Sequence, residues 1–447
     1  MSLAQQMQLE QRYLMHTYAR LPVEFVRGDG CYLYDSDGTR YLDFLAGIGS
    51  VCLGHGNAVV TEAIAQQATR LMQVGNYFYT AGRGELAQRL SAFLNGEKPA
   101  PWTQGTAEER PLAGKKPLVE NKPLAGKKPL VEEKSTTATE SASVQDDWKL
   151  FFANSGAEAN EGAIKLARKY GTHYRSGAFT IVSLKRSFHG RSLATTAATG
   201  QEVKQEAFAP MPAGFIHIQP GDVQALADLL QAGTSPAICA VMVECIQGEG
   251  GVWPLSPDYL RAVRELTAKR AVLLIIDEVQ TGFCRSGLPF AFMHSAIRPD
   301  VVTLAKGIAN GFPCGALAAT GRAANVFEPG EHGSTFGGNP LAVAAAHATL
   351  DQLVERDLVA HVAEMGTYLS ERLLALPHVS EVRGKGLMLG IGLSQPRAAE
   401  IAVRVLKRGL VLGAIGTDTL RLLPPLSVSR AQADAALDIL ESILETL

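Results

Sequence analysis

Short apolar runs that end in polar or glycine-rich residues alternate with amphipathic stretches along much of this 447-residue chain. This alternation is the strongest constraint on the fold, because strands separated by helices favour a mostly parallel sheet with helices on its faces. The apolar runs cover residues 150–153, 180–184, 240–243, 272–276 and 301–304. We therefore predict an α/β fold, and we expect the polar groups that follow these strands to meet beyond their carboxyl ends.

The pattern differs at the two ends of the chain, which predicts a large domain over residues 71–325 and a smaller α+β domain. Residues 326–447 contain two helical stretches followed by short strands. Residues 1–70 contain a short meander of strands separated by turn signals. We expect these two terminal segments to pack together as the smaller domain.

Residues 97–147 form a segment of different composition inside the large domain. The sequence PLAGKKPLVE occurs at residues 111–120 and again at residues 123–132, and a polar run follows. Two copies are too few for a solenoid, and their proline, glycine and lysine content disfavours a packed element. We predict an inserted low-complexity surface loop, and a docking segment is the alternative.

Charge and cysteine content narrow the class of function. The chain has 42 lysines and arginines against 44 acidic residues, so no net positive field favours nucleic acid or an anionic membrane. The six cysteines include no CxxC pair, and no run of about 18 apolar residues occurs, so we expect a protein without a secretory signal. We expect a cytoplasmic enzyme with a small charged substrate and no metal site.

Lys306 and Asp277 each follow an apolar run, and together they predict a covalent cofactor site. A lysine at a strand end is usually a surface group, but desolvation would lower its pKa and make its amine nucleophilic. Asp277 requires a strong partner to offset its own desolvation, and a protonated pyridine nitrogen would be such a partner. The alternatives for Asp277 are a helix cap or, with Glu278, a metal-binding pair, although the chain has no GxxxxGK[ST] motif.

Two glycine-rich segments could bind a phosphate group. Ser155 is a suitable N-cap, and the free amides of Gly156 and Ala157 at the positive end of the following helix would hold an anion. Ser334 and Thr335 lie in the second segment, where their hydroxyls could bind phosphate or cap the next helix. Ordinary turn chemistry is the competing interpretation for both segments.

Phe188 and Arg191 follow the apolar run at residues 180–184. An aromatic face can cover a flat heteroaromatic ring, and a guanidinium can form paired hydrogen bonds with a substrate carboxylate. A core phenylalanine and a surface arginine are the alternative when the two residues are considered alone.

Together these segments resemble the class III aminotransferases of the fold-type-I pyridoxal phosphate superfamily, and within that family the acetylornithine aminotransferases. The resemblance covers nearly the whole chain outside residues 97–147. Its motifs are residues 152–160 (FANSGAEAN), 188–191 (FHGR), 247–251 (QGEGG), 277–282 (DEVQTG), 304–307 (LAKG) and 332–340 (HGSTFGGNP). The resemblance implies a homodimer of the aminotransferase fold that uses pyridoxal 5′-phosphate and takes amino-acid and 2-oxo-acid substrates.

The resemblance also implies roles for individual residues. Lys306 would bind the cofactor as a Schiff base and then move a proton between the substrate α-carbon and the cofactor. Asp277 would hold the pyridine nitrogen. The other cofactor-binding residues would be Gly156 and Ala157 at the phosphate, Phe188 and Val279 on the two faces of the ring, Gln280 near the ring oxygen, Glu278, and Thr335 from the second subunit.

Arg191, with Ser334 near it, would bind the α-carboxylate of the amino donor. Glu249 would cover Arg421 while the acylated chain of N-acetylornithine is bound, and would release it for glutamate and 2-oxoglutarate. A removable partner is a sensible arrangement because an unpaired buried arginine is costly. The implied reaction is a ping-pong transfer that gives N-acetylglutamate semialdehyde and glutamate, a step of arginine biosynthesis.

The chain also departs from the family pattern. Cys245 replaces a usual proline, residues 54–57 lack the usual His-Pro, and residues 81–83 form a different turn beside the expected substrate segment. Ornithine, succinylornithine, N-acetyllysine and 4-aminobutyrate transaminases therefore stay open as alternatives. A non-catalytic pyridoxal phosphate-binding regulator, or a decarboxylase or racemase on the same fold, would leave Glu249 and Arg421 without a task.

Overall fold

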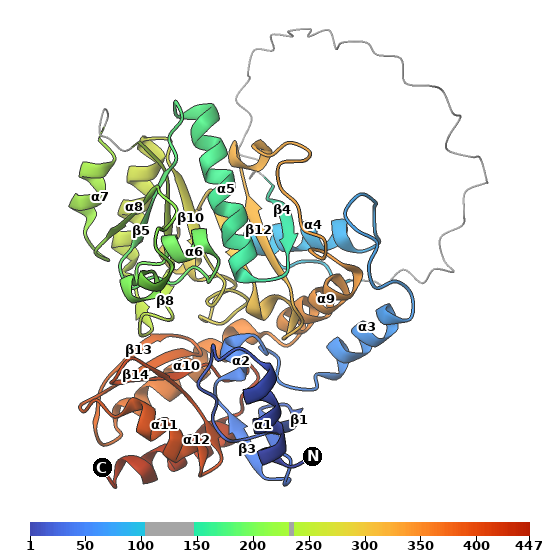
Figure 1. The fold of residues 1–447 in the computed structure, drawn as a ribbon, viewed down its shortest axis with the longest axis vertical. Helices are drawn as coiled ribbons and strands as arrows, with labels where there is room; N and C mark the ends of the chain where they lie inside the picture. Colours follow the sequence, from blue (N-terminus) through green and yellow to red (C-terminus); the bar gives the residue numbers. More distant parts are fainter. Residues whose placement is uncertain (103–146, 232–236) are drawn as a thin grey trace.

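The computed structural model describes residues 1–102, 147–231 and 237–447, and a seven-stranded sheet lies at its centre (Figure 1). The strand order is β4-β12-β11-β10-β7-β5-β6, and only β12 runs antiparallel to its neighbours among these strands. The strands are β4 (Lys149–Ala153), β5 (Thr180–Leu184), β6 (Phe215–Ile218), β7 (Ile238–Val243), β10 (Leu273–Asp277), β11 (Val301–Leu304) and β12 (Gly315–Ala319). The predicted mostly parallel α/β sheet is confirmed.

Helices cover both faces of this sheet because its strands are apolar on both sides. In β10, Leu273 and Ile275 pack in one core cluster with α5 (Gly156–Tyr174). The alternate residues Leu274 and Ile276 pack in a second cluster with α8 (Pro257–Lys269). Both faces of the central strands are therefore covered, and a ligand can reach the sheet only at the strand ends.

The N-terminal meander and the C-terminal segment share a sheet. Its strands are β1 (Phe25–Asp29), β2 (Tyr32–Asp35), β3 (Arg40–Asp43) and β15 (Leu410–Val411). β15 pairs in parallel with β3, which joins the two ends of the chain as expected. A further sheet, in the order β13-β14-β17-β16, consists of β13 (Val379–Lys385), β14 (Met388–Leu393), β17 (Thr419–Leu422) and β16 (Gly413–Ile415). The domain limits 1–70, 71–325 and 326–447 stay a prediction.

The remaining helices surround these sheets (Figure 1). They are α1 (Leu3–Tyr13), α2 (Ala46–Gly49), α3 (Ala58–Ala68), α4 (Arg83–Leu94), α6 (Leu193–Ala198), α7 (Val223–Leu229), α9 (Pro340–Glu355), α10 (Leu358–Leu374), α11 (Ala398–Leu406) and α12 (Arg430–Leu444). None of the helices in the described ranges is both long and apolar enough to cross a membrane.

The predicted inserted loop at residues 97–147 falls mostly outside the described residues, since residues 103–146 are not among them. Its two flanks are described and are attached to the large sheet region. The amide of Trp102 donates to Asp351 of α9, and the amide of Trp148 donates to the hydroxyl of Ser91 in α4.

Candidate active site

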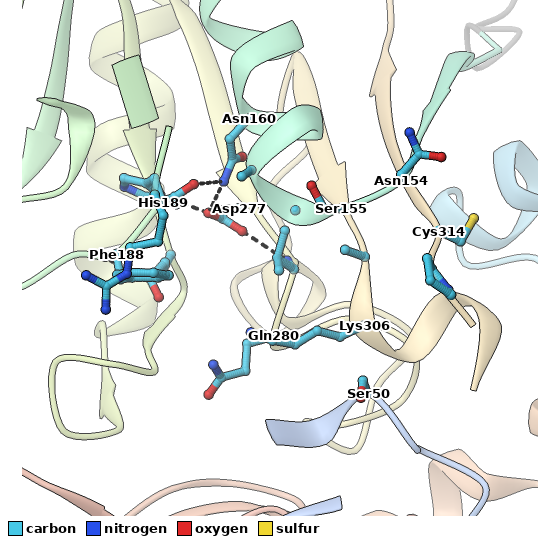
Figure 2. Close-up of a pocket in the computed structure, with 18 of the residues that line it drawn as sticks. Ser50, Asn154, Ser155, Asn160, Phe188, His189, Asp277, Gln280, Lys306 and Cys314 are labelled. Carbon is cyan, nitrogen blue, oxygen red and sulfur yellow. Dashed lines mark hydrogen bonds and ion pairs between the residues drawn. The ribbon is translucent and has the colours of Figure 1, made fainter. Parts of the chain in front are cut away.

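A cavity of about 360 Å³ lies at the carboxyl ends of the parallel strands of the central sheet. Loops that follow β4, β5, β7, β10 and β11 form its walls, as the topology predicts. Figure 2 shows Lys306 and Gln280 on one side of this space and Asp277, His189 and Asn160 on the other. The predicted site residues in its lining are Gly156, Ala157, Phe188, Arg191, Asp277, Val279, Gln280 and Lys306.

Lys306 follows β11 after one intervening residue, Ala305, and begins a short 3₁₀ turn, η4 (Lys306–Ala309). Its φ of 46° lies in the left-handed region, which is unfavourable for a residue with a Cβ and is found at functional sites. Desolvation lowers the pKa of its ammonium group, although the carboxylates of Glu249 and Asp277 oppose this effect. A larger fraction of the amine is therefore unprotonated, which is the nucleophilic form.

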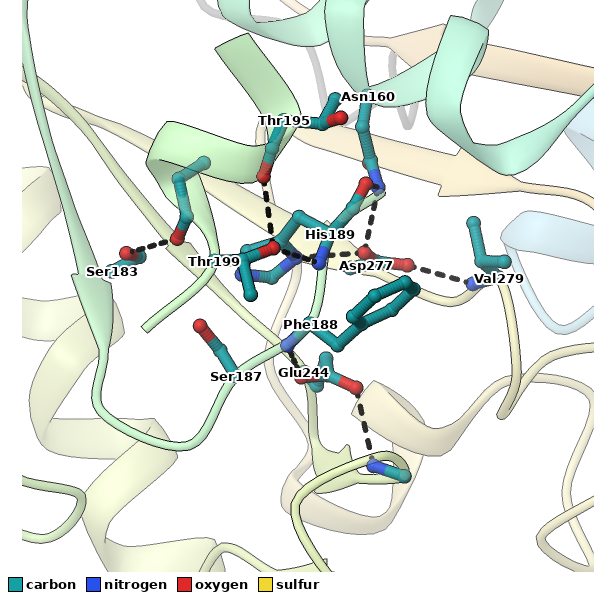
Figure 3. Close-up of polar contacts among 12 residues, drawn as sticks. Asn160, Ser183, Ser187, Phe188, His189, Thr195, Thr199, Glu244, Asp277 and Val279 are labelled. Atoms are coloured by element: carbon teal, nitrogen blue, oxygen red, sulfur yellow. Dashed lines mark hydrogen bonds and ion pairs between the residues drawn. The ribbon is translucent and has the colours of Figure 1, made fainter. Parts of the chain in front are cut away.

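Asp277 ends β10 and is held by three hydrogen-bond donors (Figure 3). Its Oδ1 accepts from the amide of Val279 at 3.0 Å, and its Oδ2 accepts from Nδ2 of Asn160 and pairs with Nδ1 of His189, each at 2.8 Å. Burial opposes the charged form of His189, but the hydrogen bond and charge of Asp277 outweigh it, so the pKa of His189 is raised. These donors fix the position of the Asp277 carboxyl group in the cavity wall.

Sequence reasoning did not identify Asn160 and His189 as supports of Asp277. Both residues lie inside motifs that carry the family resemblance, and this was the only sequence feature that could have pointed to them. Their common partner is 117 and 88 residues away in the chain, so no local pattern shows the contact.

The first turn of α5 borders the same cavity. The hydroxyl of Ser155 caps the helix by accepting the amide of Glu158 at 3.2 Å. The first-turn amides of Gly156 and Ala157 have no partner within the helix and lie at its positive end. A Cβ at Gly156 would stand 2.7 Å from Cγ1 of Val279, so the absence of a side chain lets the helix approach the loop after β10.

The residues present fit pyridoxal phosphate, the group that the family resemblance implies. The cavity offers an amine, a supported carboxylate and a helix N-terminus, which match a carbonyl, a pyridine nitrogen and a phosphate. Among the described residues, Oε1 of Gln280 and Oδ1 of Asn160 are buried polar atoms without a hydrogen-bond partner. Both residues line this cavity, so it presents polar atoms that a ligand can satisfy.

Glu249 and Arg421 form an ion pair beside these groups. Arg421 lies in β17 and is 5% exposed, whereas Glu249 lies in the loop between β8 (Ile246–Gln247) and β9 (Trp253–Pro254). Burial raises the pKa of the Glu249 carboxyl, but Arg421 and then Lys306 outweigh this effect, so the pKa is lowered. The pair is close enough to Lys306 to act on its charge, although neither residue lines the 360 Å³ cavity.

Ser334 and Thr335 line a neighbouring cavity of about 370 Å³ rather than the first one. The two cavities are adjacent because both include Asn154 and Ala157, and Nδ2 of Asn154 donates to Oγ of Ser334 at 3.1 Å. The predicted phosphate contact of Thr335 is therefore not made within this single chain.

Glu278 does not lie in either cavity. Its carboxylate accepts from the hydroxyl of Thr281 and, at 2.9 Å, from the amide of Phe292. Glu278 directly follows β10, and its side chain is 0% exposed, so it lies in the core rather than in the cavity with Asp277. The assignment of Glu278 to the cofactor is therefore at odds with its position.

Residues 13–110 and 120–444 match the family model described as Aminotransferase class-III. The chain is a class III aminotransferase. Class III aminotransferases use pyridoxal 5′-phosphate, in agreement with the chemistry of the cavity.

Relatives of this class III aminotransferase include the acetylornithine aminotransferase of Gloeobacter violaceus, which is 42% identical over 443 residues and aligns 98% of this chain with 97% of its own. The acetylornithine aminotransferase of Caldanaerobacter subterraneus is 39% identical, with 98% of each chain covered. Among solved structures, the ornithine aminotransferase of Toxoplasma gondii matches with a TM-score of 0.83 and 26% identity, over 100% of this chain and 96% of that one. The acetylornithine aminotransferase of Elizabethkingia anophelis matches with a TM-score of 0.78 and 28% identity over 100% of both chains.

Proposed function

We propose that this class III aminotransferase moves the amino group of N-acetylornithine to 2-oxoglutarate in two half-reactions, giving N-acetylglutamate semialdehyde and glutamate. The ion pair of Glu249 with Arg421 carries the proposal, because it places a removable partner over a buried arginine beside Lys306. The relatives named acetylornithine aminotransferase support the same substrate, which belongs to arginine biosynthesis.

Pyridoxal phosphate, when bound, supplies an electron sink for negative charge that develops at the substrate α-carbon. In the proposed reaction Asp277 would face the pyridine nitrogen, and its three hydrogen-bond donors hold the carboxyl group in place for this contact. Lys306 would hold the cofactor and, once freed by the donor, would take the proton from the substrate α-carbon and pass it to the cofactor. Gly156 and Ala157 hold the phosphate through their amides.

Two arginines divide the recognition of the substrates. Arg191 lies at the cavity wall with its guanidinium carbon 5.4 Å from the ring centre of Phe188, in a position to bind the α-carboxylate. With Glu249 paired to Arg421, the charge of that guanidinium is balanced, which suits the neutral acetyl group of the donor. With the pair open, Arg421 is available for the second carboxylate of glutamate or 2-oxoglutarate.

A homodimer is part of the proposal, with Thr335 completing the phosphate site of the partner. The loop that carries Thr335 is tied to residues 73–76, since Nδ2 of Asn76 donates to the carbonyl oxygens of Ser334 and Gly337. Directly after Asn76, the side chains of Tyr77, Phe78 and Tyr79 are 97%, 62% and 103% exposed in one chain. An exposed aromatic cluster next to an incomplete cavity is typical of a subunit interface.

A panel of amino donors with 2-oxoglutarate tests the proposed substrate. The donors are N-acetylornithine, succinylornithine, ornithine, N-acetyllysine and 4-aminobutyrate, compared by kcat/KM. We expect N-acetylornithine to be among the best donors. Ornithine aminotransferases are among the structural matches, so a clear preference for ornithine would replace the substrate and leave the mechanism in place.

A further inference from the structure

Glu244 is a buried carboxylate in the wall of the active-site cavity to which the proposed reaction gives no task. It follows β7 and is 6% exposed. One oxygen accepts the amide of Phe188 at 2.9 Å, and the other accepts the amide of Gly248 at 3.2 Å (Figure 3). In the part of the chain that the structure describes, these two amides are its hydrogen-bond donors.

The two amides belong to segments with different tasks. Phe188 presents its ring to the cavity, whereas Gly248 directly precedes Glu249 in the loop between β8 and β9. This loop also lies close to the cofactor site, since a Cβ at Gly248 would meet the side-chain amide of Gln280 at 2.4 Å. A single side chain therefore fixes the loop of Glu249 against the aromatic wall.

Because Glu244 is buried, its charged form depends on these two hydrogen bonds. Burial raises the pKa of Glu244 to about 7, Asp277 adds to this effect, and His189 and the two amides oppose it. Because a buried carboxylate depends on its donors, loss of either bond leaves a polar group unsatisfied. Gln247 separately donates to the carbonyl oxygen of Lys185 at 2.9 Å, and Nε of Arg383 donates to the carbonyl oxygen of Gly251 at 3.1 Å, so the loop keeps other attachments when Glu244 is changed.

We propose that Glu244 is a positioning residue for donor selection, which holds Glu249 over Arg421 by fixing the Gly248 amide to the Phe188 segment. The inference rests on the proposed function, in which the closed pair suits a neutral distal group and the open pair suits a dicarboxylate. Displacement of the Gly248 amide shifts this balance towards the open pair and frees Arg421.

The variant Glu244→Gln tests this inference, because it replaces one of the two acceptor oxygens with an NH₂ group, which cannot accept a hydrogen bond from a backbone amide. The quantity measured is the ratio of kcat/KM for N-acetylornithine to that for glutamate. We expect the ratio to fall about tenfold, as for loss of one charge-assisted hydrogen bond. Glutarate, a dicarboxylate without an amino group, should bind the variant several-fold more tightly than wild type in calorimetry.

A double-mutant comparison separates positioning from a general structural effect. If Glu244 acts through Glu249, the ratio for Glu244→Gln combined with Glu249→Gln should equal that for Glu249→Gln alone. The proposal would be overturned if Glu244→Gln lowered kcat/KM equally for both donors or left the glutarate affinity unchanged. It would also be overturned if the two substitutions changed the ratio independently. Glu244→Asp, which keeps the charge but shortens the reach, provides the same test if the glutamine variant does not fold.

Glu278→Gln is the matched control. Glu278 is another buried carboxylate whose pKa burial raises to about 7, but its partners are Thr281 and Phe292. The donor ratio should be unchanged in this variant. If the wild-type enzyme does not use N-acetylornithine, the proposed function fails. The ratio is then measured with the best donor that lacks a distal carboxylate in place of N-acetylornithine. This ratio still tests the proposal about Glu244.

Discussion

Asp277 and Glu278 are adjacent carboxylates with opposite surroundings. Asp277 faces the cavity and is held by three donors, whereas Glu278 is enclosed in the core by Thr281 and Phe292. A motif match places both residues in one site, because it records identity and spacing. Their surroundings separate the two carboxylates, since Asp277 lines the cavity and Glu278 is 0% exposed in the core.

We expect Glu278→Gln to remove a pH-dependent destabilisation of the folded protein. Burial raises the pKa of Glu278 from its ordinary value of 4.5 to about 7, so the folded state favours the protonated carboxyl. This stabilisation is complete below pH 4.5 and is lost as the pH rises to about 7, at a cost of roughly 3 kcal/mol. The melting temperature of the variant should rise relative to wild type between about pH 5 and about pH 8. A difference in melting temperature between variant and wild type that does not change with pH would contradict the prediction.

At the scale of elements, the site depends on where strands end and where α5 begins. The mainly apolar runs at residues 180–184 and 301–304 agree with β5 and β11, because short runs of this kind are typical of buried strands. The start of α10 at Leu358 is harder to predict, because Asp357 precedes it in a left-handed conformation with φ of 46° and its side chain makes no cap hydrogen bond. Local pattern thus predicts buried elements better than their capped ends.

We expect Gly156→Ala to weaken binding of pyridoxal phosphate by about tenfold, since overpacking costs on the order of 1–3 kcal/mol. The added Cβ would stand 2.7 Å from Cγ1 of Val279, which forces the first turn of α5 away from the loop after β10. Titration of the apoprotein with the cofactor measures the effect. Gly84→Ala is the control, because a Cβ there meets no atom within 4 Å in α4. Equal affinities of wild type and Gly156→Ala would refute this role of the glycine.

For the whole molecule, distant segments complete both the fold and the site. β15 joins the N-terminal meander, and Arg421 of β17 reaches Glu249, which is 172 residues away. No local sequence pattern predicts such contacts. The family resemblance suggested the pair of Glu249 and Arg421, and the structure brings their side chains together. Thr335 remains the residue whose proposed partner lies outside a single chain.

Subunit mixing tests the shared site of the proposed dimer. Lys306→Ala should be inactive because it lacks the amine, and Thr335→Ala should bind the cofactor poorly in both sites. When the two variants are unfolded and refolded together, half of the dimers are mixed and one of their two sites is native. Activity should therefore recover to roughly a quarter of wild type. No recovery, with mixed dimers shown by mass, would mean that each subunit builds its own phosphate site.

The six cysteines of the chain are all buried and unpaired, so their reaction with a thiol reagent can report local unfolding. Burial raises the pKa of the thiols of Cys31, Cys52, Cys239 and Cys314 to about 12. An alkylating reagent reacts with the thiolate, so the folded protein offers it neither access nor ionised sulfur. Each thiol should react only when its surroundings open, and labelling rates followed by mass spectrometry would rank the local unfolding of the meander at Cys31 against that of the central sheet at Cys239.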